Sequence, residues 1–210
     1  MPLRVGVLVS GAGTNLQALI DAIERGDLQA TIALVVSNAP LAPALERAAR
    51  HSLRIFVVSR ADYPERAARH AAIRDALDAV AVDLVVLAGF NEVLDSAFVR
   101  SFAGRMINTH PSLLPAFAGG MHAVRDALAH GAKVSGCTVH FVTEAVDEGP
   151  IILQRCVAVL DADSEESLHA RIREQEHRAL PEAVALFAQG RLTVDRRHVR
   201  VAPPPVAAPD

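Results

Sequence analysis

Short apolar runs rich in β-branched residues alternate with helical patterns through the first two-thirds of the chain. Strands that are apolar almost throughout are buried on both faces, which indicates a parallel sheet covered by helices. We therefore predict an α/β fold: an open, mostly parallel twisted sheet with helices on both faces. The expected strands are Arg4–Val9, Thr31–Ser37, Arg54–Val58, Leu84–Ala88 and Met106–Asn108, and the expected helices are Asn15–Glu24, Ala42–His51, Pro64–Ala81 and Ser96–Phe102.

The last third of the chain has a different pattern. Two longer apolar runs, Val134–Val142 and Ile151–Val159, flank a loop over residues 143–150. They predict strands of mixed direction that extend the sheet.

A long helix is predicted after these strands. Asp163 and Glu166 have the spacing of a capping box, with Asp163 as the N-cap. The helix is expected to run to about Gln189, where Gly190 can end it. Pro181 should kink or interrupt it.

The length of 210 residues suits one sizeable α/β domain. We place this single domain at residues 1–195 and treat residues 196–210 as a C-terminal extension. Its proline-rich tail, from Ala202 onward, is expected to be disordered.

The charge and cysteine content restrict the partners and the compartment. The formal net charge is −3, with 21 Lys and Arg against 24 Asp and Glu and no basic block, so we expect no nucleic-acid partner. No apolar stretch reaches about 18 residues and no signal-peptide pattern is present, so we expect no membrane partner. Cys137 and Cys156 are far apart, which fits a reducing compartment. We expect a cytoplasmic protein, as a monomer or weak homodimer, that acts on small molecules.

A glycine-rich loop follows the first strand, as Ser10-Gly11-Ala12-Gly13-Thr14-Asn15. Glycines let the backbone approach a ligand closely, and the next helix offers free N–H groups to an anion. A simple tight turn explains the loop equally well. A dinucleotide fingerprint fits less well, because Leu16 stands where its third glycine would be. A single terminal phosphate is the better candidate ligand.

Asn108, His110 and Asp147 are the strongest candidates for catalysis. Asn108 and His110 are two residues apart, so on an extended strand their side chains point to the same side. An amide can stabilise an oxyanion, an imidazole can carry a proton, and a carboxylate can set the charge of the imidazole, which together suit acyl transfer to an amine. Taken singly, each residue is better explained as a strand-end or turn residue, and it is their joint position beside the glycine-rich loop that favours a site.

Two other kinds of site fit the sequence poorly. The histidines His110, His122 and His140 lack a recognisable metal-ligand spacing, so we expect no metal. A hydrolytic triad built on Ser112 lacks the Gly-x-Ser-x-Gly turn.

Several motifs together resemble the phosphoribosylglycinamide formyltransferase family over roughly residues 3–195. They are the glycine-rich loop at residues 10–15, Leu87-Ala88-Gly89-Phe90, Asn108-Thr109-His110-Pro111-Ser112-Leu113-Leu114-Pro115, Val146-Asp147-Glu148-Gly149-Pro150 and Gln175-Glu176-His177. The resemblance implies a Rossmann-like formyltransferase fold. It also implies formyl transfer from 10-formyltetrahydrofolate, as co-substrate, to the amine of phosphoribosylglycinamide in purine biosynthesis.

The resemblance also implies a role for particular residues. Gly13, Thr14 and Asn15 would hold the substrate phosphate, and Glu176 its ribose. Asn108 and a protonated His110 would stabilise the tetrahedral intermediate, with Asp147 favouring the cationic imidazole. Arg66 would reach the glutamate tail of the folate. The folate pocket would be lined, largely through backbone groups, by Asn91, Glu92, Val93, Leu94, Asn108, Thr143, Glu144, Ala145 and Val146.

Two departures from the family pattern lie near this pocket. The family usually carries Met-Arg or Met-Lys where this chain has Asn91-Glu92, and usually a proline and one glycine where it has Phe117-Ala118-Gly119-Gly120. The alternatives are a formyltetrahydrofolate hydrolase, a formyltransferase with another phosphorylated acceptor, and a non-catalytic domain of the same fold.

Overall fold

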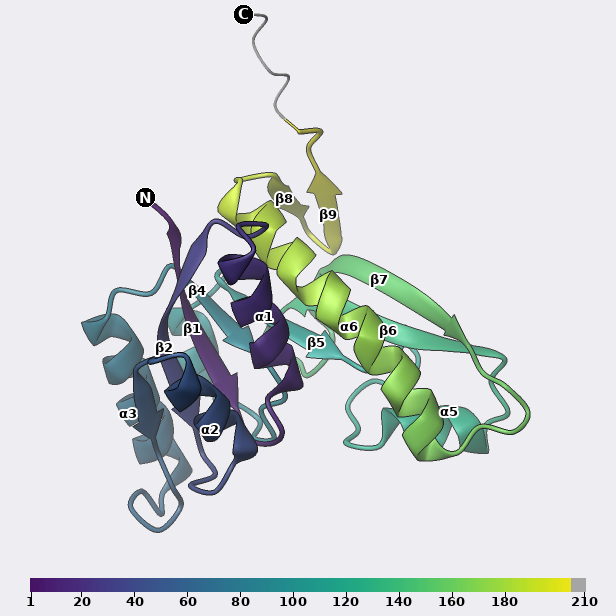
Figure 1. The fold of residues 1–210 in the computed structure, drawn as a ribbon, viewed down its shortest axis with the longest axis horizontal. Helices are drawn as coiled ribbons and strands as arrows, with labels where there is room; N and C mark the ends of the chain where they lie inside the picture. The colour runs from purple at the N-terminus through teal and green to yellow at the C-terminus, as the bar shows by residue number, and fades with distance from the viewer. Residues whose placement is uncertain (205–210) are drawn as a thin grey trace, which may run out of the picture.

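The computed structural model describes residues 1–204, which form one nine-stranded sheet (Figure 1). The strand order is β3-β2-β1-β4-β5-β6-β7-β9-β8; β1 to β5 run parallel, and β6 and β7 continue the sheet in antiparallel pairs. The predicted fold class is therefore confirmed. The strands are β1 (Leu3–Val9), β2 (Ala30–Ser37), β3 (Ile55–Val57), β4 (Leu84–Leu87), β5 (Met106–His110), β6 (Val134–Phe141), β7 (Ile151–Ala158), β8 (Leu192–Asp195) and β9 (His198–Val201).

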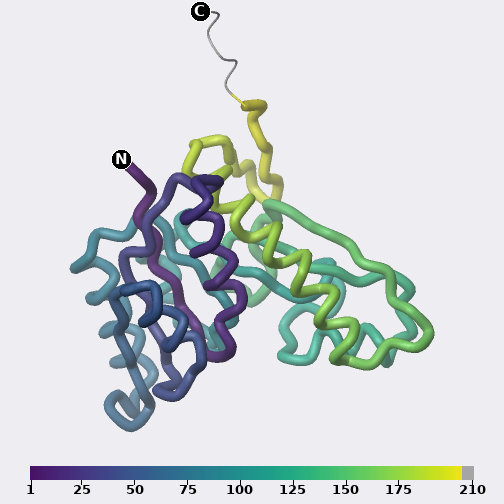
Figure 2. Tube along the Cα trace, viewed as in Figure 1, coloured from purple at the N-terminus to yellow at the C-terminus, as the bar shows by residue number. Residues whose placement is uncertain are grey.

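Helices cover both faces of the sheet. On one face α1 packs against α2 and α6, and on the other α3 packs against α4. Figure 2 shows α1 and α6 side by side although they stand far apart in the sequence. The helices are α1 (Thr14–Glu24), α2 (Pro43–Arg50), α3 (Arg66–Ala79), α4 (Ser96–Ser101), α5 (Ala123–Ala129) and α6 (Glu165–Ala188).

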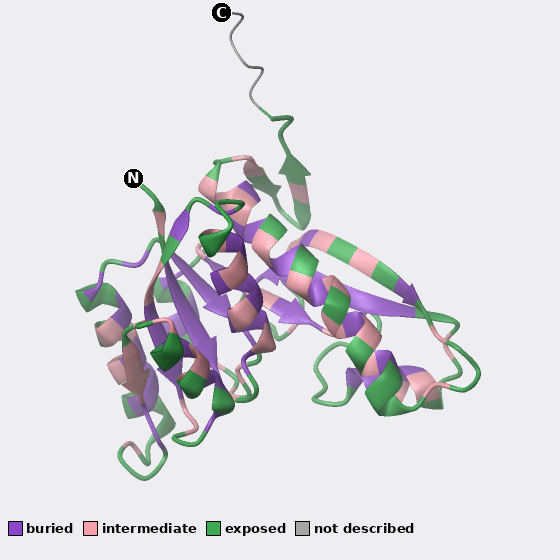
Figure 3. Cartoon of the chain, viewed as in Figure 1, coloured by how far each residue is buried: buried purple, intermediate pink, exposed green. Residues whose placement is uncertain are grey.

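Successive side chains of β1 point to opposite faces of the sheet, and each face has its own core layer. Val5, Val7 and Val9 belong to the layer under α1 and α6, whereas Leu8 belongs to the layer under α3. A Cβ at Gly6 would lie 2.4 Å from Leu77 Cδ2, so a glycine lets α3 sit close to the sheet. Figure 3 shows the resulting buried central strands between helices with exposed outer faces.

The chain end differs from the prediction. β9 pairs with β8 and, at one residue pair, with β7, so the sheet continues past the expected boundary at residue 195 to Val201. These strands are mostly exposed, and each has only 4 residues, so their apolar alternation is too short to reveal them in the sequence. The expected disordered tail falls partly on residues 205–210, which lie outside the described residues.

The N-cap expected for α6 was wrong by one residue. Ser164 is the N-cap, and it forms a capping box with Ser167, not with Glu166. Asp163 instead pairs with Arg171 at 2.7 Å. Pro181 lies inside the helix, which continues through it uninterrupted to Ala188.

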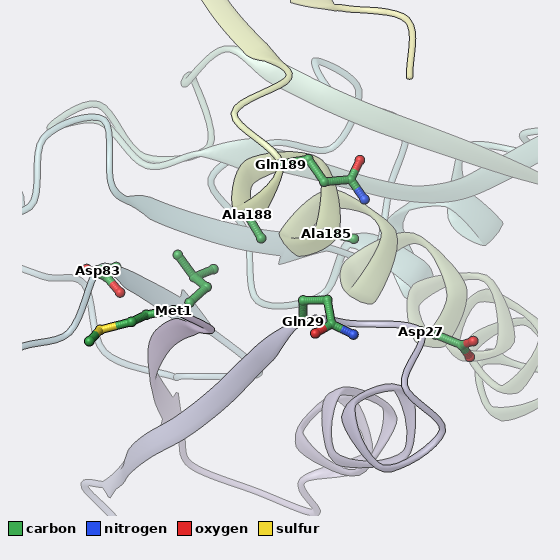
Figure 4. Close-up of a pocket in the computed structure, with 8 residues that line it drawn as sticks. Met1, Asp27, Gln29, Asp83, Ala185, Ala188 and Gln189 are labelled. Atoms are coloured by element: carbon green, nitrogen blue, oxygen red, sulfur yellow. The ribbon is translucent and has the colours of Figure 1, made fainter. Parts of the chain in front are cut away.

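A pocket lies at the amino ends of β1, β2 and β4, away from the edge where ligands of such sheets bind. Figure 4 shows Met1, Gln29, Asp83 and Gln189 around it. No helix within residues 1–204 has both the length and the apolar composition needed to cross a membrane.

Candidate active site

The glycine-rich loop, the segment over residues 91–94 and the Asn108–His110 pair lie at the carboxyl ends of β1, β4 and β5. The strand order reverses at β1, which has β2 on one side and β4 on the other. A crevice forms at such a reversal because the loops leave the sheet in opposite directions. The Ser10 N–H donates to the Gly89 carbonyl oxygen at 3.0 Å, so the loops that follow β1 and β4 are joined directly.

The glycine-rich loop has a conformation that requires Gly13. This residue is left-handed, with φ 72°, and is the N-cap of α1. A Cβ at Gly13 would lie 2.6 Å from Ala44 Cβ and 2.7 Å from Ala44 Cα. Both the backbone conformation and the close approach of α2 exclude a larger residue. The loop therefore presents the amino end of α1 toward the crevice in a fixed geometry.

Asn15 and Glu176 lie together although Asn15 is in the first turn of α1 and Glu176 is in α6. Asn15 Nδ2 is 3.4 Å from Glu176 Oε2, and Thr109 Oγ1 is 3.5 Å from Glu176 Oε1. Burial raises the pKa of Glu176 to about 7, although both of these donors act to lower it. The structure thus joins two of the four residues expected at the acceptor, Asn15 and Glu176, to Thr109 of β5, and the other two, Gly13 and Thr14, directly precede Asn15.

A second pocket runs along α1, lined by Thr14, Gln17, Arg47 and His177 among others. Arg47 Nε donates to the Ala12 carbonyl oxygen at 2.8 Å, so a guanidinium from α2 adjoins the glycine-rich loop. Arg47 was not among the residues expected from the sequence. It lies far from every motif in the chain, and only the packing of α2 on the loop reveals it.

His110 and Asp147 form the expected pair. His110 Nδ1 is 3.4 Å from Asp147 Oδ2, and both side chains are at most 10% exposed. His110 Nε2 is 3.1 Å from the Phe117 carbonyl oxygen. Both ring nitrogens therefore face acceptors, and only the doubly protonated ring donates to both. Asp147 also accepts from the Gly119 N–H at 2.9 Å, which joins the loop over residues 116–120 to the pair.

Asn108 is held by a residue that sequence reasoning had weighed only as a metal ligand. His140 lies directly opposite it on β6, with Asn108 Nδ2 3.2 Å from His140 Nε2. Burial lowers the pKa of His140, and its Nδ1 lies 2.9 Å from the Phe141 carbonyl oxygen. A neutral ring that donates from Nδ1 accepts at Nε2, which orients the Asn108 amide. The sequence alone does not place His140 beside Asn108, because this contact depends on the antiparallel register of β5 and β6.

The structure also describes the residues of the two other kinds of site, a hydrolytic triad on Ser112 and a metal site. Ser112 is fully buried and its hydroxyl donates to the Ala116 carbonyl oxygen at 2.6 Å, so it is not placed as a nucleophile. Among residues 1–204, no group of three or more His, Cys, Asp or Glu side chains is arranged to hold a metal ion.

The segment over residues 91–94 follows β4 at the same edge. The Asn91 N–H donates to Ser10 Oγ at 3.0 Å, and Asn91 Oδ1 accepts from Asn38. Val93 is 57% exposed, and Leu94 packs partly into the core layer under α3. The Glu92 side chain turns inward, and only 6% of it is exposed.

The loop over residues 143–146 is exposed and carries Asp147 at its end. Thr143 Oγ1 donates to the Ala145 carbonyl oxygen at 3.1 Å, and Glu144 pairs with Arg100 at 3.0 Å. A Cβ at Gly149 would lie 1.6 Å from the Phe141 carbonyl oxygen, so a glycine is needed to close this loop onto β6. Val146 is also exposed.

Arg66 is the exposed first residue of α3. No hydrogen bond or ion pair within the described chain joins it to the other predicted site residues, so its expected contact with the folate rests on the sequence resemblance.

The family profile described as "Formyl transferase" matches residues 3–184. The chain belongs to this family. It is 48% identical over 193 residues to the phosphoribosylglycinamide formyltransferase of Mycobacterium tuberculosis H37Rv, covering 92% of this chain and 88% of that protein. A crystal structure of glycinamide ribonucleotide transformylase 1 from Symbiobacterium toebii has 50% identity and a TM-score of 0.93, covering 95% of this chain and 94% of that one.

Larger proteins contain a similar region. The trifunctional purine biosynthetic protein adenosine-3 of Drosophila melanogaster is 47% identical over 189 residues, which cover 89% of this chain. The chain spans only 14% of the length of that relative.

Proposed function

We propose that this protein transfers the formyl group of 10-formyltetrahydrofolate to the glycinamide amine of phosphoribosylglycinamide, as a step of purine biosynthesis in the cytoplasm. One observation carries the proposal: the Asn108–His110–Asp147 cluster is linked through Thr109 of β5 to Glu176 and Asn15, at the start of the helix that follows the glycine-rich loop. Relatives that bear the name of this activity match nearly the whole chain.

The acceptor end suits a phosphorylated ribose. The amino end of α1 offers N–H groups to a phosphate, and the nearby Arg47 adds positive charge. Glu176 carries carboxyl oxygens, which can accept hydrogen bonds from ribose hydroxyls. Its burial makes the carboxyl costly to leave unpaired, so a ligand that donates to it is favoured.

The reaction proceeds by direct transfer. The substrate amine attacks the formyl carbon, and the carbonyl oxygen becomes an oxyanion that accepts from Asn108 Nδ2 and the His110 imidazolium. His110 then gives a proton to N10 of the folate, directly or through water, while the bond between the formyl carbon and N10 breaks and tetrahydrofolate leaves. The proton that the amine loses passes through water to His110 and restores the imidazolium. No covalent enzyme intermediate is required.

The roles of Asp147 and His140 follow from their contacts. Asp147 faces His110 Nδ1 and favours the cationic ring by opposite charge. His140 is buried and its pKa is lowered, so it stays neutral and holds the Asn108 amide in place. For the oxyanion to reach His110 Nε2, the Phe117 carbonyl that now faces this atom must withdraw.

The folate end is formed by the segments 91–94 and 143–146, with Arg66 at the glutamate tail. Their backbone amides and carbonyls suit the donor and acceptor edge of a pterin ring.

Transfer of an isotopically labelled formyl group tests this function. We expect label to move from 10-formyltetrahydrofolate to phosphoribosylglycinamide. The dephosphorylated riboside should react with a kcat/KM lower by at least about 100-fold, because it loses the charge-assisted contacts of the phosphate. Equal rates with the two acceptors would contradict the phosphate site. Label found only in formate would favour a hydrolase.

A further inference from the structure

Glu92 stands where the sequence resemblance led us to expect a basic residue, and its side chain points into the protein. Only 6% of it is exposed. Its Oε1 lies 2.5 Å from Arg69 Nη2, and its Oε2 lies 3.3 Å from Asn38 Nδ2. Burial alone would raise the pKa of Glu92, but these donors bring it below its ordinary value, so the carboxylate is charged.

Arg69 links this carboxylate to a second loop. Its side chain is 5% exposed, and Nη1 donates to the carbonyl oxygens of Tyr63 at 2.7 Å and Pro64 at 2.9 Å. One guanidinium thus joins α3, the loop before it and the segment that follows β4. A buried cation with this many partners holds a rigid arrangement because each donor has a fixed direction.

The other end of the segment is held in a similar way. His70, 2% exposed, lies between two carboxylates: its Nε2 is 3.3 Å from Glu92 Oε1 and its Nδ1 is 2.8 Å from Asp95 Oδ2. Asp95 is the N-cap of α4 and accepts from the Phe98 N–H at 2.8 Å. The first residue, Asn91, is fixed by Ser10 and Asn38.

The backbone between these anchors is available to a ligand. Within the described residues, no hydrogen bond from protein atoms engages the N–H groups of Glu92, Val93 or Leu94. The exposed Val93 lies at the centre of the segment. Free polar groups on a backbone held at both ends form a pre-organised recognition edge, which a ligand meets without ordering cost.

We propose that the buried Arg69–Glu92 ion pair positions the segment 91–94 for the pterin ring, so that Arg69 and Glu92 are positioning residues for folate binding. The inference rests on the proposed function, because it takes the ligand of this segment to be the formyl folate. The unexpected acid at residue 92 is then compatible with folate binding, because the buried Arg69 neutralises its charge and holds the segment in place.

Steady-state kinetics of Glu92→Gln test the proposal. We expect the KM for 10-formyltetrahydrofolate to rise at least about 10-fold, with kcat and the KM for phosphoribosylglycinamide within about 3-fold of the wild type. Asp163→Asn is the matched control, because it also breaks an ion pair between a buried carboxylate and an arginine, at Arg171. It should leave all three parameters unchanged. An unchanged folate KM in folded Glu92→Gln would overturn the proposal, as would an equal change in the Asp163→Asn control.

A double variant with the two charges exchanged provides a second test that still applies if Glu92→Gln folds poorly. Arg69→Glu/Glu92→Arg restores an ion pair with opposite polarity, and we expect it to bring the folate KM back toward the wild-type value relative to Arg69→Glu alone. A folate KM no better than that of Arg69→Glu would count against the ion pair as the positioning element.

Hydrogen exchange separates this proposal from the proposed function. The peptide that covers residues 89–96 should exchange faster in Glu92→Gln than in the wild type, with or without folate. If the wild type has no folate-dependent activity, the proposed function fails, whatever the exchange rates show. If the wild type is active and exchange increases while the folate KM does not, the positioning role is wrong.

Discussion

The two ends of the candidate site are built in different ways. The acceptor end depends on backbone geometry: Gly13 takes a left-handed conformation against Ala44, and α1 starts there. The folate end depends on side chains, because the segment 91–94 is held by Arg69, Asn38 and His70.

The difference determines what each end tolerates. A backbone requirement admits one residue type at one position, so Gly13 has no substitute. A side-chain anchor can be replaced by another pair of partners with the same reach. The acid at residue 92 is therefore compatible with an intact pocket, whereas a change at residue 13 is not.

The largest effect is expected where the two ends meet. His110→Ala and Asp147→Asn should each reduce kcat/KM at least about 100-fold, because each removes a charged group from the transition state. Circular dichroism should show a folded protein in both variants. Turnover close to that of the wild type in either one would refute the assigned mechanism.

Glu176→Gln tests the acceptor end through stability. The pKa of Glu176 is raised to about 7 in the folded protein from 4.5, so the folded state binds more protons between these values and stability falls as pH rises through this window. The loss is roughly 3 kcal/mol at most. Urea unfolding at pH 4.5, 6 and 8 should show a smaller loss in Glu176→Gln than in the wild type. Identical pH dependence in both proteins would contradict the buried carboxyl.

Gly13→Ala tests the backbone requirement. The left-handed conformation and the contact with Ala44 should together cost about 2 kcal/mol of unfolding free energy. The KM for the phosphorylated acceptor should rise as well. Gly11→Ala is the control, because a Cβ there meets nothing within 4 Å. Equal stability of the two variants in urea would refute the account of the loop.

Arg66→Gln should have the smallest effect. The side chain is exposed, so its attraction for the folate glutamate is screened, and we expect the folate KM to rise only about 3-fold at low salt. The effect should disappear at high salt. A KM ratio between variant and wild type that does not depend on salt would show that Arg66 does not act by charge.

The sequence predicts the features that leave a local pattern, and it misses those that depend on contacts between distant residues. The apolar runs locate the core strands, because burial on both faces leaves a local signal. The glycine-rich loop and the Asn108–His110 spacing are local signals too. The exposed hairpin of β8 and β9, the short helix α5 and the N-cap at Ser164 were missed or misplaced because their local patterns are weak or ambiguous.

The remaining residues of the site depend on tertiary contacts. His140 meets Asn108 only through the antiparallel register of β5 and β6. Glu92 meets Arg69 across 23 positions of the chain, and neither residue belongs to a motif that predicts the other. The inward orientation of Glu92 could therefore be learned only from the structure.

In the proposed reaction, a phosphorylated amine at one end of the site receives the formyl group of a folate bound at the other end. Absorbance can follow tetrahydrofolate release from 10-formyltetrahydrofolate with and without phosphoribosylglycinamide. We predict release only when the amine is present, in equal amount to the formylated amine. Release at the same rate without the amine would contradict the claim and indicate a hydrolase.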